Sequence, residues 1–352
     1  MSAINPADVS LMTNQNSKPN SVVETQLNVI EGKYPKKPEL TKGFDSAKED
    51  VYIAGNEGVA EIVAVGRSVK PDGASQGLKI GDWVVIDKPQ TGTWANWNVV
   101  QWRDIIRVPR RELDSKFTEP AAATMMVNPL TAVGLLSDIH RVQKSHFVMQ
   151  NGANSAVGQA VIQVAKQMSV KTINFMRDRP DYPALKEYLT KLGADHVFTY
   201  DELLDPSFKT KFKQIISGSE CRHAVNGIGG ETATAMAALM KHKGNLISYG
   251  GMSKQPLKIP VGLHIFNDLK CHGYWHSSVW ESFSKEVRAQ RINDIASWVE
   301  GGHLQAPLHE VVTLEGTDEE VTNTVKDTLK RIQAGRLGKK LLLKWKLPET
   351  SG

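Results

Sequence analysis

Cysteine is scarce in this chain, which has two cysteines among 352 residues. Cys221 and Cys271 form neither a Cys-x-x-Cys pair nor a Cys/His ligand pattern, which argues against a disulfide framework and a structural zinc site. We therefore expect a reducing compartment and no bound metal. The sequence also has no apolar run long enough to span a bilayer, so we expect no membrane span.

A strong excess of charge of one sign is also lacking. The net charge is +5 at pH 7, and Lys and Arg are interspersed with Asp and Glu. Because nucleic-acid binders concentrate basic residues in a patch or an arm, we expect no nucleic-acid partner. The hydrophobic content of 40% is that of a globular protein, and the length favours two domains.

Residues 146–250 alternate between short apolar runs and segments of helical periodicity. The pattern predicts strands at 146–151, 172–177 and 196–200, and helices at 155–168 and 180–193. Such alternation is typical of βαβ units in a parallel sheet. Residues 51–110 instead carry short Val-, Ile- and Trp-rich runs between turn residues, which predicts an antiparallel barrel. Residues 9–28 are polar and without period, so we expect a loop or disorder there.

A glycine-containing turn follows the first of these strands. Gly152, Ser155 and Gly158 have the G-x-x-S-x-x-G spacing at the start of a predicted helix. A dinucleotide fingerprint requires a tight turn, a small residue beside the pyrophosphate and a glycine where helix packs on strand. Backbone N–H groups at the helix N-terminus would then bind the phosphates. A turn without ligand has the same spacing.

The second strand ends in Arg177-Asp178-Arg179. An acidic residue here binds the ribose 2′-hydroxyl of NAD, whereas arginine suits the 2′-phosphate of NADPH. Two arginines flank the single aspartate, so the segment favours NADPH. An ordinary charged loop has the same composition. Tyr249 to Met252, which includes Gly250 and Gly251, follows a later strand and has the same two interpretations, a close approach to a ligand or a plain turn.

The chain resembles the mitochondrial trans-2-enoyl-CoA/ACP reductases of the medium-chain dehydrogenase/reductase superfamily. The matching segments run in the family order along nearly the whole chain: INPAD (4–8), EGKYPKKP (31–38), GNEGV (55–59), GTWANW (92–97), VNPLTA (127–132), NGANSAVGQAVIQVAK (151–166), RDRPD (177–181), YGGMSKQP (249–256), HIF (264–266) and GYW (273–275).

The resemblance implies an α/β protein of two domains. A GroES-like, partly open β-barrel catalytic domain would comprise residues 1–120 and 279–352, and a Rossmann domain with a doubly wound parallel sheet would comprise 121–278. It further implies NADPH as cofactor, a homodimer and the mitochondrial matrix as location. The implied reaction is reduction of trans-2-enoyl thioesters on acyl carrier protein or CoA in mitochondrial fatty acid synthesis.

The resemblance also assigns site residues. The proton-donor tyrosine of the family corresponds to Tyr34, and Asn56, Trp94 and Trp275 would line the substrate pocket. The implied cofactor contacts are Asn128, Gly152, Asn154, Ser155, Ala156, Val157, Gly158, Arg177, Asp178, Arg179, Tyr249, Gly250, Gly251, Met252, Tyr274, Trp275, His276 and Lys339. Zinc-dependent relatives have Gly-His-Glu where this chain has Gly55-Asn56-Glu57, which agrees with a metal-free reaction.

Two alternative functions remain open from the sequence. A zinc-free NADPH quinone oxidoreductase of the same superfamily would share the cofactor domain but would not need Tyr34. A protein that binds NADPH without turnover is the other alternative. Reduction of quinones but not of enoyl thioesters would favour the first, and bound NADPH that is not consumed would favour the second.

The chain departs from the family pattern at its beginning. The family has strands and a targeting presequence before INPAD, and we interpret this chain as lacking them. Residues 9–26 also interrupt the family pattern, and we hypothesise that they are a translated intron. Val9-Ser10 can be encoded by GTAAGT, a splice donor, and Gln26 by CAG, an acceptor end. A cDNA that retains the segment would contradict this hypothesis.

Overall fold

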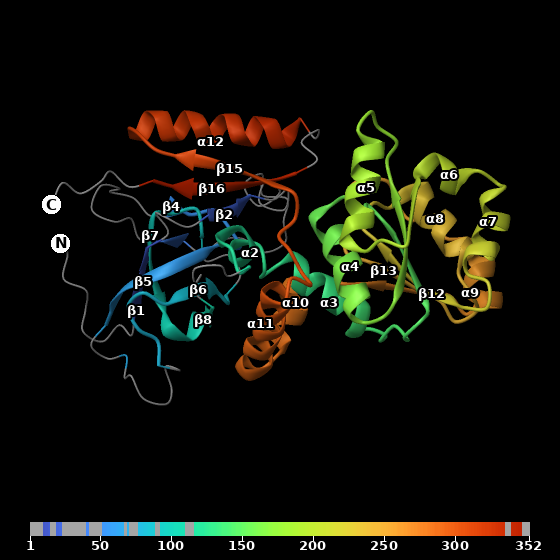
Figure 1. Cartoon of the computed structure of the whole chain (residues 1–352), viewed down its shortest axis with the longest axis horizontal. Coiled ribbons are helices and arrows are strands. Elements are labelled where there is room, and N and C mark those ends of the chain that lie inside the picture. The colour runs from blue at the N-terminus through green and yellow to red at the C-terminus, as the bar shows by residue number, and fades with distance from the viewer. Residues whose placement is uncertain are drawn as a thin grey trace. The chain divides into compact units, whose positions relative to one another are not determined.

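The structure, a computed structural model, describes residues 10–14, 19–22, 40–41, 51–66, 69, 77–88, 92–109, 116–334 and 339–346. They form two compact units, each described by itself below (Figure 1). One unit runs to Val127 and resumes at Lys285, and the other is Asn128–Ser284. The boundaries expected from the sequence, 120/121 and 278/279, fall a few residues before these.

The unit Asn128–Ser284 is built on a six-stranded parallel sheet with the order β11-β10-β9-β12-β13-β14. Its strands are β9 (Phe147–Asn151), β10 (Lys171–Met176), β11 (His196–Thr199), β12 (Cys221–Asn226), β13 (Asn245–Ser248) and β14 (Lys270–Gly273). The chain moves outward from β9 to β11, then returns to the other side of β9 with β12. This is the Rossmann strand order, and the carboxyl ends of β9 and β12 form its switch point.

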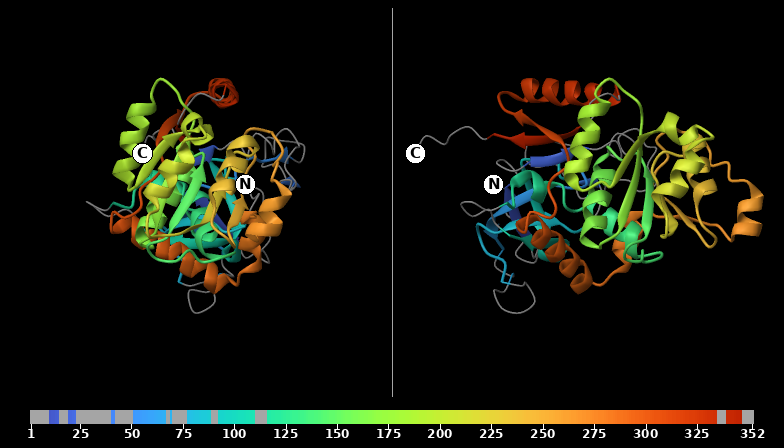
Figure 2. Two further views of the ribbon diagram at one scale, coloured as in Figure 1. Left: turned by 90° about the vertical axis from the view of Figure 1, so that its right-hand side faces the viewer. Right: turned by 45° about the vertical axis from the view of Figure 1, so that its right-hand side comes forward.

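Helices cover both faces of this sheet (Figures 1 and 2). They are α3 (Asn128–Ser137), α4 (Ala156–Gln167), α5 (Tyr182–Leu192), α6 (Tyr200–Leu204), α7 (Phe208–Ile215), α8 (Gly230–Leu239), α9 (Val261–Asn267) and α10 (His276–Ser282). The second helix predicted from the sequence, 180–193, ends at Gly193, whose φ of +115° closes α5 in the left-handed conformation. Leu203, Phe208 and Met236, from α6, α7 and α8, pack against Phe175 and Met149 of the strands.

The other unit contains a five-stranded sheet with the order β7-β1-β5-β6-β8. Its strands are β1 (Ser10–Asn14), β5 (Val59–Val65), β6 (Trp83–Ile86), β7 (Trp97–Gln101) and β8 (Ile105–Val108), and each neighbouring pair is antiparallel. A short 3-10 helix, Trp102–Asp104, links β7 to β8. Ile62, Val84, Val100 and Ile105 form the core of the sheet.

The segment 9–28 differs from the loop that the sequence leads us to expect. The structure places β1 there, between β5 and β7, and also β2 (Pro19–Val22), which pairs with β16. The physical reason is tertiary: a strand whose two edges are both hydrogen-bonded is held by its partners, whatever its own propensity. The intron-derived insert proposed for 9–26 would include both strands, and its origin stays a hypothesis for the transcript to test.

A three-stranded sheet, β15-β16-β2, completes this unit together with its helices. The remaining elements are β3 (Leu40–Thr41), β4 (Val51–Tyr52), α2 (Glu119–Ala123), α11 (Lys285–Glu300), β15 (His309–Leu314), α12 (Asp318–Gln333) and β16 (Lys340–Trp345). Leu314, Leu341 and Leu343 form a small core onto which α12 packs with Val325 and Leu329. Within the described ranges, no helix combines the length and the apolar character that crossing a membrane requires.

Candidate functional site

The turn between β9 and α4 is the most specific feature of the Rossmann unit. Gly152 is buried and has a φ of +68°, a conformation that favours glycine. Ser155 is the N-cap of α4, and its hydroxyl accepts a hydrogen bond from the Gly158 N–H at 3.1 Å. A Cβ at Gly158 would lie 2.5 Å from the Gly152 carbonyl oxygen, so only glycine fits where the helix meets the turn.

The start of α4 leaves backbone donors available to an anion. Ala156 and Val157 occupy the first two helical positions, and N–H groups there have no intrahelical acceptor. Ser155 caps only the third position, Gly158. Because the helix dipole adds partial positive charge at the same end, this turn can bind a phosphate. The structure therefore brings the predicted residues from Gly152 to Gly158 together as the sequence indicates.

The hydroxyl of Tyr200 holds the β9–α4 turn at its strand end, and the sequence did not predict this contact. The Gly152 N–H donates to the Tyr200 hydroxyl at 3.0 Å. Burial raises the pKa of Tyr200, against smaller opposing effects of the Gly152 hydrogen bond and the positive charge of Arg177. Arg177 therefore acts electrostatically on the tyrosine that contacts the turn. A tyrosine directly after the third strand of the unit is the only sequence signal for this contact.

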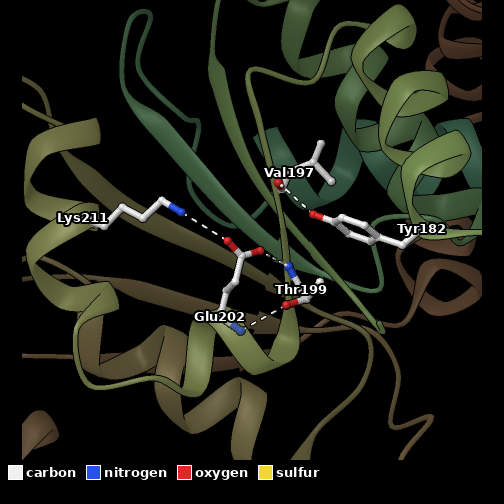
Figure 3. Close-up of polar contacts among 5 residues, drawn as sticks. All are labelled: Tyr182, Val197, Thr199, Glu202 and Lys211. Carbon is white, nitrogen blue, oxygen red and sulfur yellow. Dashed lines mark hydrogen bonds and ion pairs between the residues drawn. The ribbon is translucent and has the colours of Figure 1, made fainter. Parts of the chain in front are cut away.

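A capping box begins α6, whose first residue is Tyr200. Figure 3 shows Thr199 and Glu202, which form this box. The Thr199 hydroxyl accepts from the Glu202 N–H at 3.1 Å, and the Glu202 carboxylate accepts from the Thr199 N–H at 2.9 Å. Lys211 donates to the other oxygen of Glu202 at 3.2 Å. Tyr182 of α5 reaches the same region, where its hydroxyl donates to the Val197 carbonyl at 3.3 Å. The strand-to-helix corner that carries Tyr200 is thus held by side chains from three helices.

Buried amides connect the strand ends behind the turn. Asn151, at the end of β9, donates to Asn226 Oδ1 at 2.8 Å and accepts from the Gly227 N–H at 2.8 Å. Asn226, at the end of β12, donates to the Ser248 hydroxyl at 3.0 Å. Both asparagines are almost fully buried. Because buried polar groups are costly without partners, this network fixes the relative positions of the strand ends at the switch point.

The second glycine turn, between β12 and α8, differs from the first. The N–H groups of Ile228 and Gly229 both donate to Asn226 Oδ1, at 3.3 and 2.9 Å. Their donors are satisfied within the turn, so this turn is less suited to an anion than the first. Tyr249 packs on it, since a Cβ at Gly227 would lie 2.5 Å from the Tyr249 hydroxyl. Burial raises the pKa of Tyr249 to about 12, opposed by a hydrogen bond shared with Ser155.

The three charged residues after β10 are not equivalent. Arg177 is exposed and has no ion-pair partner among the residues that the structure describes. Arg179 is paired with Asp181, so its guanidinium is partly neutralised. Asp178 is exposed. Burial raises the pKa of Tyr182, and the negative charges of Glu202 and Asp178 raise it further. Arg177 is therefore the arginine most available to an anionic ligand.

Five further predicted cofactor residues of this unit have different environments. Asn128 is 5% exposed, and its Nδ2 has no hydrogen-bond partner among the described residues. Tyr274 is buried and donates to Asp138 Oδ2 of the loop after α3 at 3.1 Å, so its hydroxyl faces the protein interior. Trp275 and Met252 are exposed, at 43% and 54%. His276 begins α10, and its ring packs at a tilt against the ring of Trp280.

The barrel-containing unit brings two predicted substrate residues together. The Trp94 N–H donates to the Ala54 carbonyl at 2.9 Å, and the Thr93 N–H to the Gly55 carbonyl at 3.2 Å. Gly55, with a φ of +107°, allows this approach, because a Cβ there would lie 2.6 Å from Trp94 Cδ1. Asn56 follows directly, and its buried Oδ1 has no partner in the described part of the chain. Tyr34 lies outside the described residues.

Lys339 and Lys340 illustrate the limit of the sequence prediction for this unit. The predicted cofactor contact Lys339 is half exposed and paired with Glu310 at 2.9 Å. The neighbouring Lys340 is buried and pairs with Glu57 at 2.5 Å, and the Glu57 side chain is fully buried. Nothing in the local sequence distinguishes one lysine from the other, so this buried ion pair was missed.

The side chains around Asn56 do not fit a zinc ion. Glu57 already binds Lys340 and the Val127 N–H. No group of three or more His, Cys, Asp or Glu side chains with metal-binding geometry occurs in the part of the chain that the structure describes. Asn56 supplies an amide in place of the soft nitrogen or sulfur ligands that zinc sites use.

Comparisons with known proteins agree with this geometry. The zinc-binding dehydrogenase family matches residues 156–290. The mitochondrial enoyl-[acyl-carrier-protein] reductase of Homo sapiens is 38% identical over 291 residues, which cover 83% of this chain and 72% of that protein. The enzyme of the same name from Yarrowia lipolytica is 36% identical over 91% of this chain and 80% of that protein.

Solved structures give the same result. The mitochondrial 2-enoyl thioester reductase Etr1p/Etr2p heterodimer from Candida tropicalis superimposes with a TM-score of 0.88 at 29% identity, covering 98% of this chain and 93% of that chain. The Etr1p complex with NADP and crotonyl-CoA superimposes with a TM-score of 0.86 at 30% identity, over 96% and 92% of the two chains. The predicted fold class, a Rossmann domain beside a GroES-like barrel, is confirmed. The chain belongs to the family of mitochondrial enoyl-[acyl-carrier-protein] reductases.

Proposed function

We propose that this protein reduces trans-2-enoyl thioesters to saturated acyl thioesters with NADPH. The observation that carries the proposal is the turn between β9 and α4, where the first N–H groups of the helix have no intrahelical acceptor, together with the exposed Arg177 that directly follows β10. In a chain of this family, that turn fits the pyrophosphate, and the Arg177 guanidinium, which has no ion pair with another described residue, fits the 2′-phosphate that distinguishes NADPH from NADH.

The remaining cofactor contacts follow from where each side chain lies. Gly152 and Gly158 keep the turn open to the phosphates, and the N–H groups of Asn154, Ala156 and Val157 are its donors. The Asn128 Nδ2, which has no hydrogen-bond partner among the described residues, is proposed to face the nicotinamide end. Tyr274 faces Asp138 with its hydroxyl, so any contact with the cofactor uses its backbone. The segments Tyr249–Met252, Trp275–His276 and the residue Lys339 stay proposals from the family resemblance.

NADPH, when bound, supplies the hydride that the β-carbon of the substrate receives. The chain must then stabilise the negative charge that develops on the thioester oxygen, and protonate the α-carbon. Tyr34 is the proposed proton donor, because a phenol with a pKa near ~10 can donate both a hydrogen bond and a proton. Asn56, Trp94 and Trp275 are proposed to line the acyl pocket, where exclusion of water strengthens hydrogen bonds to the substrate.

We propose a mitochondrial role with acyl carrier protein as the carrier of the substrate. The human and Yarrowia lipolytica relatives are named mitochondrial enoyl-[acyl-carrier-protein] reductases. The Etr1p structure contains crotonyl-CoA, a short enoyl thioester on a different carrier. Both carriers present the same thioester, so the reacting group is common to them and only the docking surface differs.

We propose that the protein is a homodimer that uses the free edge of the Rossmann sheet. Among the described strands, β14 pairs only with β13, so its other edge has no partner in that part of the chain. The preceding helix α9 exposes Val261, Ile265 and Phe266, at 69%, 65% and 77%. An open strand edge beside an exposed apolar patch is typical of an interface, and the same patch on a second copy would cover both.

A comparison of substrates and cofactors tests the proposed reaction. The protein is incubated with NADPH or NADH and either trans-2-hexenoyl-CoA or a quinone, and consumption of the nicotinamide is followed by absorbance. The proposal predicts turnover with NADPH and the enoyl thioester, with hexanoyl-CoA as the product identified by mass spectrometry. Turnover of the quinone alone would assign the protein to a different reaction of the superfamily. NADPH binding without consumption of either substrate would show a binding protein.

A further inference from the structure

The Glu57–Lys340 ion pair is unusually buried for a pair of charges. Glu57 is 0% exposed and Lys340 is 8% exposed, with a contact of 2.5 Å between Oε1 and Nζ. The pair joins the segment before β5 to the first residue of β16, across 283 positions of sequence. Because desolvation offsets much of the attraction, such a pair adds little stability compared with well-packed apolar residues. A contribution to stability therefore does not explain why this pair is buried.

The surroundings of Glu57 indicate the role of the pair. Its second oxygen, Oε2, accepts from the Val127 N–H at 3.2 Å, and its backbone carbonyl accepts from the Thr93 hydroxyl at 3.0 Å. Glu57 thus joins three segments of the chain: its own, the one at Thr93 and the one at Val127. Each of these segments carries a residue assigned to the site above: Asn56 precedes Glu57, Trp94 follows Thr93, and Asn128 follows Val127.

We propose that Glu57 and Lys340 are a positioning pair for the reaction. Lys340 fixes the Glu57 carboxylate, and the carboxylate fixes the peptide that leads into Asn128 while the Glu57 backbone fixes Thr93. The pair thereby sets the main-chain positions of two proposed substrate contacts and one proposed cofactor contact. This inference rests on the proposed function.

The geometry of the Asn56 segment supports the assignment. Gly55 approaches Thr93 and Trp94 so closely that a Cβ would lie 2.3 Å from Thr93 Oγ1. The segment therefore has no freedom to adjust if its anchor moves. Asn56 Oδ1 is buried without a partner in the described residues, as expected for an acceptor kept for a ligand or for an approaching donor. Displacement of reacting groups by about 1 Å reduces rates by about 100-fold, so a rigid anchor is valuable here.

The test compares Glu57→Gln, Lys340→Met and the double variant E57Q/K340M in the full chain. Each single variant leaves one buried group without its partner, and should lower the thermal midpoint of unfolding. The double variant removes both charges, so its midpoint should return close to that of the wild type. Lys344→Met is the matched control, because Lys344 lies on the same strand and pairs with Glu119 at 2.8 Å in a less buried position.

Three quantities are measured: the thermal midpoint, the NADPH dissociation constant by fluorescence, and kcat with KM for trans-2-hexenoyl-CoA. The proposal predicts that the double variant folds like the wild type, while kcat falls by about 10- to 100-fold and NADPH binds more weakly, because the main chain that leads into Asn128 loses its anchor. Lys344→Met should leave kcat unchanged. A double variant with wild-type stability and wild-type kcat would show that the pair is only structural. A wild type without turnover would instead overturn the proposed reaction, and the positioning role with it.

Discussion

Replacement of Gly158 by alanine provides a sharp test of the cofactor turn. The new Cβ would lie 2.5, 2.6 and 2.7 Å from backbone atoms of Gly152 and Ala153. Ordinary carbon contacts are about 3.5 to 4 Å, so the start of α4 must move by about 1 Å. Overpacking of this kind costs about 1–3 kcal/mol of the free energy of unfolding. Alanine returns about 1 kcal/mol through its higher helix propensity.

Stability alone therefore gives a net loss of at most about 2 kcal/mol, and cofactor affinity is the more sensitive readout. A shift of about 1 Å takes the N–H groups of Ala156 and Val157 out of hydrogen-bonding range of a phosphate. Hydrogen bonds to charged groups contribute about 1.5–3 kcal/mol each. We therefore expect NADPH to bind about 10- to 100-fold more weakly to Gly158→Ala.

Gly262→Ala is the matched control for this experiment. Gly262 also lies in a helix, α9, but a Cβ there first meets the Phe266 ring at 3.6 Å, an ordinary contact. This variant should gain up to about 1 kcal/mol of stability and leave NADPH affinity unchanged. Both variants are measured by fluorescence titration with NADPH and by thermal unfolding. Equal NADPH affinity in the two variants would refute the assignment of the β9–α4 turn.

Three further predictions concern specificity, pH and assembly. Arg177→Ala should weaken the binding of NADPH about 10- to 100-fold and leave the binding of NADH unchanged, whereas Arg179→Ala should weaken NADPH binding less. Equal losses of affinity for NADPH and NADH in Arg177→Ala would contradict the assignment of Arg177 to the 2′-phosphate. Burial lowers the pKa of His223 from 6.5 to about 4, so as the pH falls the unfolded chain takes up this proton before the folded chain does. The free energy of unfolding should therefore fall by about 3 kcal/mol between pH 6.5 and pH 4. His223→Gln should abolish this loss in urea titrations. Phe266→Asp should convert the proposed homodimer to a monomer in light scattering, and an unchanged mass would place the interface elsewhere.

The Rossmann unit could be predicted well because its signals are local. Ser155 caps α4, Gly193 closes α5, and the apolar residues of each helix recur with the helical period. Pro206 lies between α6 and α7, where a residue without a backbone N–H interrupts the helical hydrogen bonds. The glycine turn is equally local, since Gly152, Ser155 and Gly158 contact one another within seven residues of chain.

The contacts that could not be predicted join distant positions. Tyr200 reaches Gly152 across 48 residues, and Lys340 reaches Glu57 across 283. No local pattern specifies either pairing, because each depends on which strand ends the fold brings together. Strand β1 is the corresponding case for secondary structure. Its sequence is polar, and its conformation depends on backbone hydrogen bonds to β5 and β7.

The most direct test of the central claim compares the wild type with Tyr34→Phe. NADPH consumption is followed with trans-2-hexenoyl-CoA, and thermal unfolding and NADPH binding are measured on the same samples. The account predicts turnover in the wild type and a loss of about 100-fold or more in Tyr34→Phe with NADPH affinity unchanged, because only the proton donor is removed. Equal turnover in the two proteins would contradict Tyr34 as the donor, and no turnover in either would contradict the proposed reaction.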